Sequence, residues 1–330
     1  MTTSERSQQD GEANPKQWRS MSRDKRLSLV QTIFICYPRL KALAAKLDLC
    51  AQEADRAVAN QLYLPECMVI AGDPRVGKTA FVKAWLRQKQ REPLEAGSES
   101  PFPYLSISLP PQPTIKSTLL TLLQKAEMHH FIPSSAITSS LTRMIHQCLQ
   151  TTPVYLLLID QCEHLIDRQR QRINYQLLDL VEYLIASTTT SIVLIGHAAE
   201  IEMILQASPR LTRRVCSLFR LPPFTWNRRS PETVGEYCAF LHAFDRELPF
   251  DDSGLAEETM AYRLFYASDG YIGWTTRLIQ QAAAMALEAE SPTITRSCLA
   301  KAYETSIAET PLGWQKTNPF LPEQFKEPSD

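Results

Sequence analysis

The stretch Gly72-Asp73-Pro74-Arg75-Val76-Gly77-Lys78-Thr79 decides how the rest of the chain is interpreted. It matches G-x-x-x-x-G-K-[ST] at every fixed position, between an apolar run at 68–71 and an apolar helical pattern that begins at Phe81. Glycines let the backbone N–H groups of such a turn face phosphates, and the N-terminus of the next helix adds its positive dipole end. We therefore expect 72–79 and Ala80 to bind a nucleoside triphosphate.

Two side chains of this loop have separate expected roles. Lys78 reaches the β- and γ-phosphates, and the hydroxyl of Thr79 binds Mg²⁺. The alternative is a chance match in a glycine-containing turn. Because the chain has only 10 glycines in 330 residues, and because the strand and helix are correctly placed, the sequence favours a site for ATP and Mg²⁺.

Composition limits the class of protein. Apolar residues make up 44% and charged residues 22% of the chain, which is typical of a soluble globular protein. The net charge of −1 means that any contact with nucleic acid must come from local basic patches. The eight cysteines form no C-x-x-C pair, which favours a reducing cytoplasm over a zinc site or a disulfide framework. No apolar run approaches 18 residues, so we expect no membrane span.

The pattern of apolar runs predicts an α/β fold. Besides 68–71, short buried strands are expected at 104–108, 154–159, 191–195 and 216–221, with helices between them. Five such strands alternating with helices predict a parallel sheet sandwiched by helices. Beyond Pro231 the strand signal stops, and helical patterns at 231–245, 257–268, 275–289 and 295–307 predict a separate all-α lid domain.

The expected domain boundaries follow from these patterns. We expect a disordered N-terminus at 1–24, a helical segment at 25–60, a nucleotide-binding core at 61–228, a helical lid at 229–308 and an extended, proline-rich tail at 309–330. Pro38 separates two helices within 25–60. This helical pair either packs beside the nucleotide domain or offers a docking surface to a partner.

Asp160 ends the predicted strand at 154–159, where a carboxylate can hold Mg²⁺ opposite Thr79 or cap the following turn. The residue that usually follows is a glutamate that orients the attacking water. Here it is Gln161, and a carboxylate comes two positions later, at Glu163. An amide hydrogen-bonds a water but cannot accept its proton. Either Glu163 substitutes, or hydrolysis is slow and the protein works as a switch that responds to ATP occupancy.

Three further groups of residues have two interpretations each. His197 follows the strand at 191–195 and either senses the γ-phosphate or caps the helix that begins near Ala199. In ring or filament ATPases an arginine near the last strand reaches the neighbouring subunit's γ-phosphate. The candidates are Arg210, Arg213, Arg214 and Arg220, of which we favour Arg213, with surface charge as the alternative. The run Arg168, Arg170 and Arg172 favours a solvated helix start over a DNA contact.

With these features in order, the chain resembles an AAA+ ATPase and, more specifically, the TniB/TnsC family of DNA-transposition regulators. The matching stretches lie within residues 26–307: the helical lead-in to Val69-Ile-Ala-Gly, Ser108-Leu-Pro-Pro-Gln-Pro-Thr114-Ile-Lys116, Leu157-Leu-Ile-Asp160, Val193-Leu-Ile-Gly196, Leu211-Thr-Arg213-Arg-Val, and Asp269-Gly-Tyr-Ile-Gly273. The ending Asn318-Pro-Phe320 is also similar. The phosphate loop is generic, whereas the proline-rich turn and the Gly-Tyr-Ile-Gly motif are more specific.

The resemblance implies an ATP-dependent oligomer in the bacterial cytoplasm, often a ring or helical filament around double-stranded DNA. It would recruit or activate a DDE transposase at a target chosen by a TniQ-type adaptor, sometimes with CRISPR effectors. Lys116 occupies the family position that faces DNA phosphates, and Thr138 is a looser candidate for a second contact. Such contacts bind without sequence preference and depend strongly on salt.

The sequence departs from the family pattern at three positions. Gln161 replaces the catalytic glutamate, His197 replaces the usual threonine or asparagine, and Trp274 replaces the arginine of the lid. Arg277, one helical turn further on, could reach back to the nucleotide. We therefore expect nucleotide-dependent polymerisation on DNA with weak ATPase activity, so that classification as an enzyme stays open.

Two other functions compete with this one. A replication-initiator or helicase-loader relative would favour an intact Asp-Glu pair and often a C-terminal DNA-binding domain, and neither is evident in the sequence. A signalling NTPase switch normally carries long repeat arrays, and we find no repeats.

Overall fold

The computed structural model describes residues 17–60, 67–91, 103–128, 132–133, 135–151, 154–167, 172–321 and 325. Its described part divides into two compact units. One unit is Cys36–Pro222, and the other combines the described residues before Cys36 with those after Pro222. Within the described ranges, no helix is both long and apolar enough to cross a membrane.

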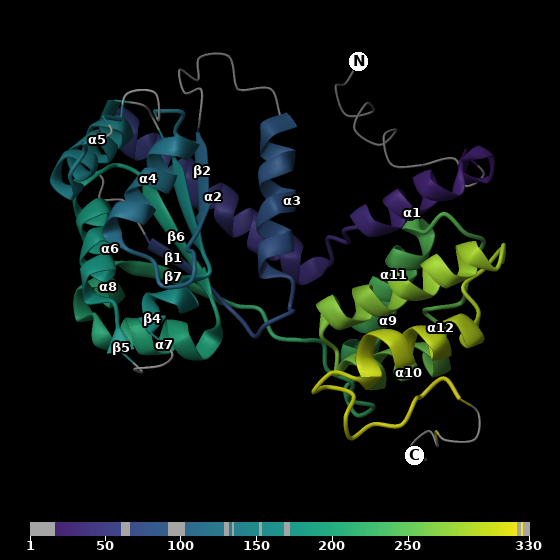
Figure 1. Cartoon of the computed structure of the whole chain (residues 1–330). Helices are drawn as coiled ribbons and strands as arrows, with labels where there is room; N and C mark the ends of the chain where they lie inside the picture. Colours follow the sequence, from purple (N-terminus) through teal and green to yellow (C-terminus); the bar gives the residue numbers. More distant parts are fainter. Residues whose placement is uncertain are drawn as a thin grey trace, which may run out of the picture. The chain divides into compact units, whose positions relative to one another are not determined.

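A five-stranded parallel sheet forms the centre of the Cys36–Pro222 unit. Its strands are β1 (Cys67–Ala71), β2 (Tyr104–Ser108), β3 (Leu156–Asp160), β6 (Ser191–Gly196) and β7 (Val215–Arg220), in the order β2-β3-β6-β1-β7 (Figure 1). The three central strands are buried along their whole length. Continuous apolar runs favour such central positions because helices cover both faces of a parallel sheet. The predicted α/β sandwich is confirmed.

Different helices cover the two faces of this sheet. Every second residue of β1, such as Val69, faces one side of the sheet. On that side it shares a core with α4 (Ile115–Lys125), α5 (Thr138–Thr151), α6 (Tyr175–Ser187), α7 (Ala198–Ala207) and α8 (Pro209–Arg214). Met68 faces the other way, where its sulfur lies 3.9 Å from Cys50 on α2 (Pro38–Asn60). Trp85 on α3 (Lys78–Arg91) donates to Asp48 of α2 at 3.1 Å. Helices α2 and α3 therefore belong to this second face.

Short elements between β3 and α6 were not predicted. A single 3-10 turn, η3 (Cys162–Leu165), leads into a two-stranded antiparallel hairpin of β4 (Ile166–Asp167) and β5 (Arg172–Ile173). Arg172 therefore lies in a strand, and the helix-start interpretation is wrong for it, because α6 begins only after Asn174 caps it. Arg168 and Arg170 lie outside the described residues.

The second unit is all-α, as predicted. It contains η1 (Gln17–Ser20), α1 (Arg23–Thr32), α9 (Pro231–Glu247), α10 (Glu258–Ser268), α11 (Ile272–Glu288), α12 (Arg296–Tyr303) and a π turn at Glu304–Ala308. Helix α1 packs on α11, where Val30 is fully buried and its carbonyl accepts from Gln280 at 3.1 Å (Figure 1).

The two N-terminal helices were expected to pack together beside the nucleotide domain. That holds for α2, whereas α1 belongs to the all-α unit. The physical reason is that the apolar face of α1 is narrow and finds its partner on α11. The expected five-segment division and the docking surface stay predictions.

The tail after Pro311 is not simply extended. Residues 309–315 form turns, and Asn318 and Phe320 are buried against α12. The side chain of Asn318 donates to the carbonyl of Ala300 at 2.9 Å, and Arg296 donates to that of Phe320 at 2.7 Å. The expectation of an extended tail is wrong up to Leu321, because proline content does not prevent a buried aromatic anchor from docking the chain.

Candidate nucleotide-binding site

The Gly72–Thr79 loop connects β1 to α3, as the sequence predicts. Gly72 follows β1 directly, and a Cβ there would lie 2.4 Å from the carbonyl oxygen of Leu221. Gly77 has a φ of 94°, which L residues avoid. The two glycines thus answer different needs, because the first allows close backbone approach and the second allows a left-handed turn at the start of α3.

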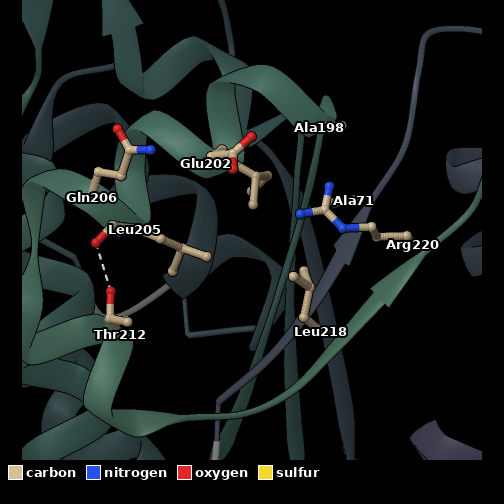
Figure 2. Close-up of a pocket in the computed structure, with 9 residues that line it drawn as sticks. Ala71, Ala198, Glu202, Leu205, Gln206, Thr212, Leu218 and Arg220 are labelled. Carbon is tan, nitrogen blue, oxygen red and sulfur yellow. Dashed lines mark hydrogen bonds between the residues drawn. The ribbon is translucent and has the colours of Figure 1, made fainter.

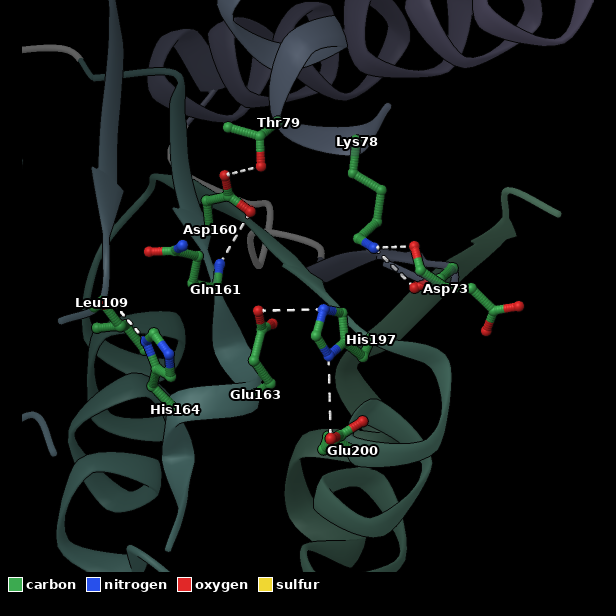
Figure 3. A network of polar contacts seen from close by, with 11 residues as sticks. Asp73, Lys78, Thr79, Leu109, Asp160, Gln161, Glu163, His164, His197 and Glu200 are labelled. Atoms are coloured by element: carbon green, nitrogen blue, oxygen red, sulfur yellow. Dashed lines mark hydrogen bonds and ion pairs between the residues drawn. The ribbon is translucent and has the colours of Figure 1, made fainter. Parts of the chain in front are cut away.

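Lys78 is buried at the first position of α3. Its ammonium donates to the carbonyls of Gly72 at 2.7 Å and of Asp73 at 2.8 Å (Figure 3). Burial lowers the pKa of Lys78 from its usual value, and nearby carboxylates oppose that shift, Glu163 most strongly and Asp160 next. A buried ammonium in the first turn of a helix is a suitable partner for an anionic ligand.

Thr79 and Asp160 meet across the site. The Thr79 hydroxyl donates to Oδ2 of Asp160 at 2.7 Å, and the N–H of Gln161 donates to Oδ1 at 2.8 Å. Asp160 therefore both supports the turn after β3 and faces the loop, so the two interpretations of it are compatible. A hydroxyl and a carboxylate are hard oxygen ligands of the kind that Mg²⁺ takes while keeping waters and phosphate oxygens. The two residues fit that ion.

The turn after Asp160 places the side chain of Glu163, and not that of Gln161, beside His197. Gln161 has a φ of 62°, and Figure 3 shows its amide pointing away from the pair formed by Glu163 and His197. The one-turn helix η3 brings Glu163 back towards the site, where it is 8% exposed. Its Oε1 lies 3.4 Å from Nε2 of His197, and its Oε2 is buried without a hydrogen-bond partner. An orphaned buried carboxylate oxygen suits a water or ion held with the ligand.

His197 occupies the N-cap position of α7, but its side chain makes no capping hydrogen bond. The imidazole lies between two carboxylates, with Nε2 near Glu163 and Nδ1 3.9 Å from Oε1 of Glu200 (Figure 3). Glu200 was not predicted. The signal that could have found it is the i, i+3 spacing from His197 in the first turn of a helix.

The candidate trans-acting arginine lies away from this cluster. Arg213 is exposed on α8 and lines a pocket of about 490 Å³ between α6 and α8, together with Arg210, Asp179 and Glu182. One guanidinium nitrogen of Arg214, in the same pocket, is buried without a hydrogen-bond partner. This pocket mixes both signs of charge.

Arg220 belongs to a second pocket. It ends β7 and lines a cavity of about 260 Å³ whose other walls come mainly from α7, with both apolar residues such as Leu205 and polar ones such as Glu202. Figure 2 shows Arg220 and Leu218 on β7, with Glu202 and Leu205 of α7 around the same pocket.

The remaining predicted site residues lie on other helices. Lys116 is exposed in the first turn of α4, which Thr114 and Ser117 cap reciprocally. Thr138 is half-buried at the start of α5. Arg277 is exposed on α11 of the all-α unit, with its guanidinium 5.7 Å from the ring centre of Trp274. Nucleotide contact by Arg277 and DNA contact by Lys116 and Thr138 stay predictions.

Solved structures with the same fold include several ORC proteins. The Aeropyrum pernix ORC2 protein in ADPNP and ADP complexes matches with a TM-score of 0.60 at 13% identity, over 86% of this chain and 72% of that one. The Aeropyrum pernix ORC1 protein in complex with DNA matches with a TM-score of 0.60 at 15% identity, over 86% and 70%. Drosophila ORC bound to DNA matches with a TM-score of 0.54 at 18% identity, over 86% and 66%. A search of the curated proteins found no match.

These structural similarities establish the fold of the chain. The sequence identities of 13–18% are too low to assign a function from them. The sheet order, the phosphate loop at the end of β1 and the helical unit are those of the AAA+ fold. A family model described as bacterial TniB protein matches residues 26–226, more than half of the chain. The chain belongs to the TniB family.

Proposed function

We propose that this protein is an ATP-dependent, DNA-binding regulator of transposition. In this proposal it assembles as an oligomer on double-stranded DNA without sequence preference, and it recruits or activates a DDE transposase at a target site with a TniQ-type adaptor. Its ATP hydrolysis is weak. Membership of the TniB family supports a role in transposition, and the geometry of the site supports the nucleotide dependence.

One observation carries the nucleotide half of the proposal. Lys78, Thr79 and Asp160 converge at the end of β1 and β3, with the hydroxyl and carboxylate 2.7 Å apart. The backbone N–H groups of the loop and the Lys78 ammonium bind the phosphates. Thr79 and Asp160 hold Mg²⁺, which neutralises phosphate charge when it is bound.

Slow hydrolysis follows from which group is available as the general base. Gln161 cannot accept a proton, and Glu163 is held near His197. When the imidazole turns to a γ-phosphate, the Glu163 carboxylate is released to accept a proton from water. Because Glu163 must first leave His197, hydrolysis is slow. Bound ATP therefore persists, and it serves mainly to hold subunits together.

The DNA contact and the subunit contact use different surfaces. Lys116 is exposed at the N-terminal end of α4, where a phosphate also meets the positive end of the helix dipole. Arg213 is exposed on α8 and can supply a guanidinium to the nucleotide of a neighbouring subunit.

Electron microscopy tests the proposal directly. The full chain is imaged with no nucleotide, with ATP and with a slowly hydrolysed analogue, each with and without duplex DNA. We expect rings or filaments on DNA with either triphosphate, and none with Lys78→Ala. Failure to assemble on DNA under every condition would refute the proposal. The replication-initiator alternative gains no support from the structural matches, since identities of 13–18% show the fold alone.

A further inference from the structure

The loop between β2 and α4 is anchored at two points and exposed between them. Leu109 and Pro113 are buried, whereas residues 110–112 and Lys116 are exposed. Its first anchor continues the strand pairing, because the N–H of Leu109 donates to the carbonyl of Asp160 at 3.0 Å. The two ends of the loop are therefore fixed, and its tip at 110–112 is exposed to solvent.

Side chains from one distant segment hold both anchors. His164 Nδ1 lies 2.7 Å from the carbonyl oxygen of Leu109, and Nδ2 of Asn174 donates to the carbonyl of Pro113 at 3.1 Å. A carbonyl only accepts, so Nδ1 of His164 carries the proton in this contact. Each bond crosses more than 50 positions of sequence, and both come from the stretch that follows Asp160. Two independent bonds to the two ends of one loop indicate a positioning device.

The same turn also reaches the nucleotide site. Glu163 and His164 are adjacent in η3, and they contact different partners, Glu163 lying near His197 and His164 near Leu109 (Figure 3). Because the two residues are adjacent in a single turn, a change in the backbone of η3 moves both side chains. A shift of Glu163 when nucleotide binds would therefore be felt at the anchor of the loop.

We propose that His164 and Asn174 are positioning residues that hold the 109–116 loop for DNA contact, and that η3 connects this loop to the nucleotide site. The ligand is the phosphate backbone of double-stranded DNA, met by Lys116 and the N-terminal end of α4. This inference rests on the proposed function, because it assigns the loop to DNA. It adds which residues set the loop's position and how nucleotide occupancy reaches it.

The Asn174 side chain allows a substitution that separates anchoring from helix capping. Its Oδ1 caps α6 by accepting from the N–H of Leu177 at 3.3 Å, whereas its Nδ2 holds Pro113. Asn174→Asp keeps the cap and removes the donor. His164→Leu removes the other anchor, and His164→Asn restores a donor near the place of Nδ1. His146 offers a matched control, because it also lies 3.0 Å from a backbone carbonyl, that of Ser187.

The experiment measures binding of the full chain to a fluorescent duplex, with a slowly hydrolysed ATP analogue, at several salt concentrations. We expect Asn174→Asp and His164→Leu to weaken DNA binding at least threefold. A plot of the logarithm of the binding constant against the logarithm of the salt concentration has a negative slope. The magnitude of that slope should decrease by about 0.9 for each phosphate that a subunit no longer neutralises. His164→Asn should recover most of the affinity, and His146→Leu should bind like wild type. Melting temperatures identify any variant that is merely unfolded.

A second set of measurements, with Lys116→Ala, tests separately whether the loop contacts DNA and whether His164 and Asn174 position it. If Lys116→Ala weakens DNA binding while Asn174→Asp and His164→Leu bind like wild type, the positioning role is wrong and the DNA contact stands. If Lys116→Ala binds DNA with wild-type affinity and salt slope, the assignment of this loop to DNA is wrong, and the positioning role is refuted with it.

Discussion

Glu163 stands two positions after Gln161, and its location depends on the turn that begins there. The backbone at Gln161 is left-handed, and Figure 3 shows the 161 side chain pointing away from Glu163 and His197, whereas the 163 carboxylate lies beside His197. Asp160, Lys78 and Thr79 were predictable, because their spacing relative to a strand and a helix fixes where they lie. Glu200 and the contact between His164 and Leu109 were not, because they depend on which face of a short turn meets which neighbour.

We predict that Glu163 is the base for the residual hydrolysis. Glu163→Gln should lower steady-state phosphate release at least tenfold, as expected for loss of a general base, and leave nucleotide affinity within about threefold. Adding Gln161→Glu to this variant should not restore hydrolysis, because the 161 side chain points away from Glu163 and His197.

The matched control is Glu202→Gln, which changes an exposed carboxylate elsewhere on α7. It should release phosphate at the wild-type rate. Two results together would contradict this prediction: fast ATP hydrolysis by the wild-type protein, and an unchanged rate in Glu163→Gln or Glu163→Ala. The assignment of the base and the proposal of weak hydrolysis would then both be wrong.

At the scale of elements, the buried strands and the long amphipathic helices were predicted well, and elements without a clear apolar pattern were not. The five strands and the helices of the all-α unit match their predicted ranges to within a few residues. Helix α8 and the β4–β5 hairpin were not predicted, because a helix of six residues completes fewer than two turns and a strand of two residues shows no alternation. Their existence depends on the contacts that they make.

The turn between α10 and α11 shows how a specific motif serves packing. Gly270 has a φ of 71°, and a Cβ there would lie 2.1 Å from the carbonyl oxygen of Phe224. The N–H of Phe224 also donates to the carbonyl of Gly270 at 2.9 Å. The glycine of the Gly-Tyr-Ile-Gly motif is thus required by backbone approach as well as by φ.

We predict that Gly270→Ala destabilises the all-α unit by more than about 2 kcal/mol, since strain and a backbone clash act together. Gly235→Ala is the control, because Gly235 lies inside α9 with open space around its missing Cβ. That change should stabilise the helix by about 0.5–1 kcal/mol. Denaturant unfolding measures both, and equal effects of the two substitutions would show that the contact between Gly270 and Phe224 is unimportant.

At the scale of the whole molecule, the two helices before the phosphate loop belong to different units. Val30 of α1 is fully buried with α11, and Leu47 of α2 is fully buried in the Cys36–Pro222 unit. The two residues are separated by only a short stretch of sequence, and both lie in segments where apolar residues recur at helical spacing. Membership of a unit is therefore a property of tertiary packing.

We predict that substitutions at these two positions affect different units. Val30→Ala should cost about 2 kcal/mol and speed hydrogen exchange in α11, and Leu47→Ala should cost about 2–5 kcal/mol and speed exchange in β1 and β6. Hydrogen exchange followed by mass spectrometry reads the two units separately. Faster exchange in β1 and β6 after Val30→Ala, with α11 unchanged, would contradict the division.

The sequence alone determined the phosphate loop, the succession of strands and helices along the chain, the all-α character of the C-terminal part and the resemblance to TniB proteins. These depend on local spacing and periodicity, which are properties of neighbouring residues. Only the tertiary structure decided that α1 joins the all-α unit, that Glu163 faces His197, and that His164 and Asn174 hold the 109–116 loop. Those facts depend on contacts between residues far apart in the chain, and no local pattern specifies them.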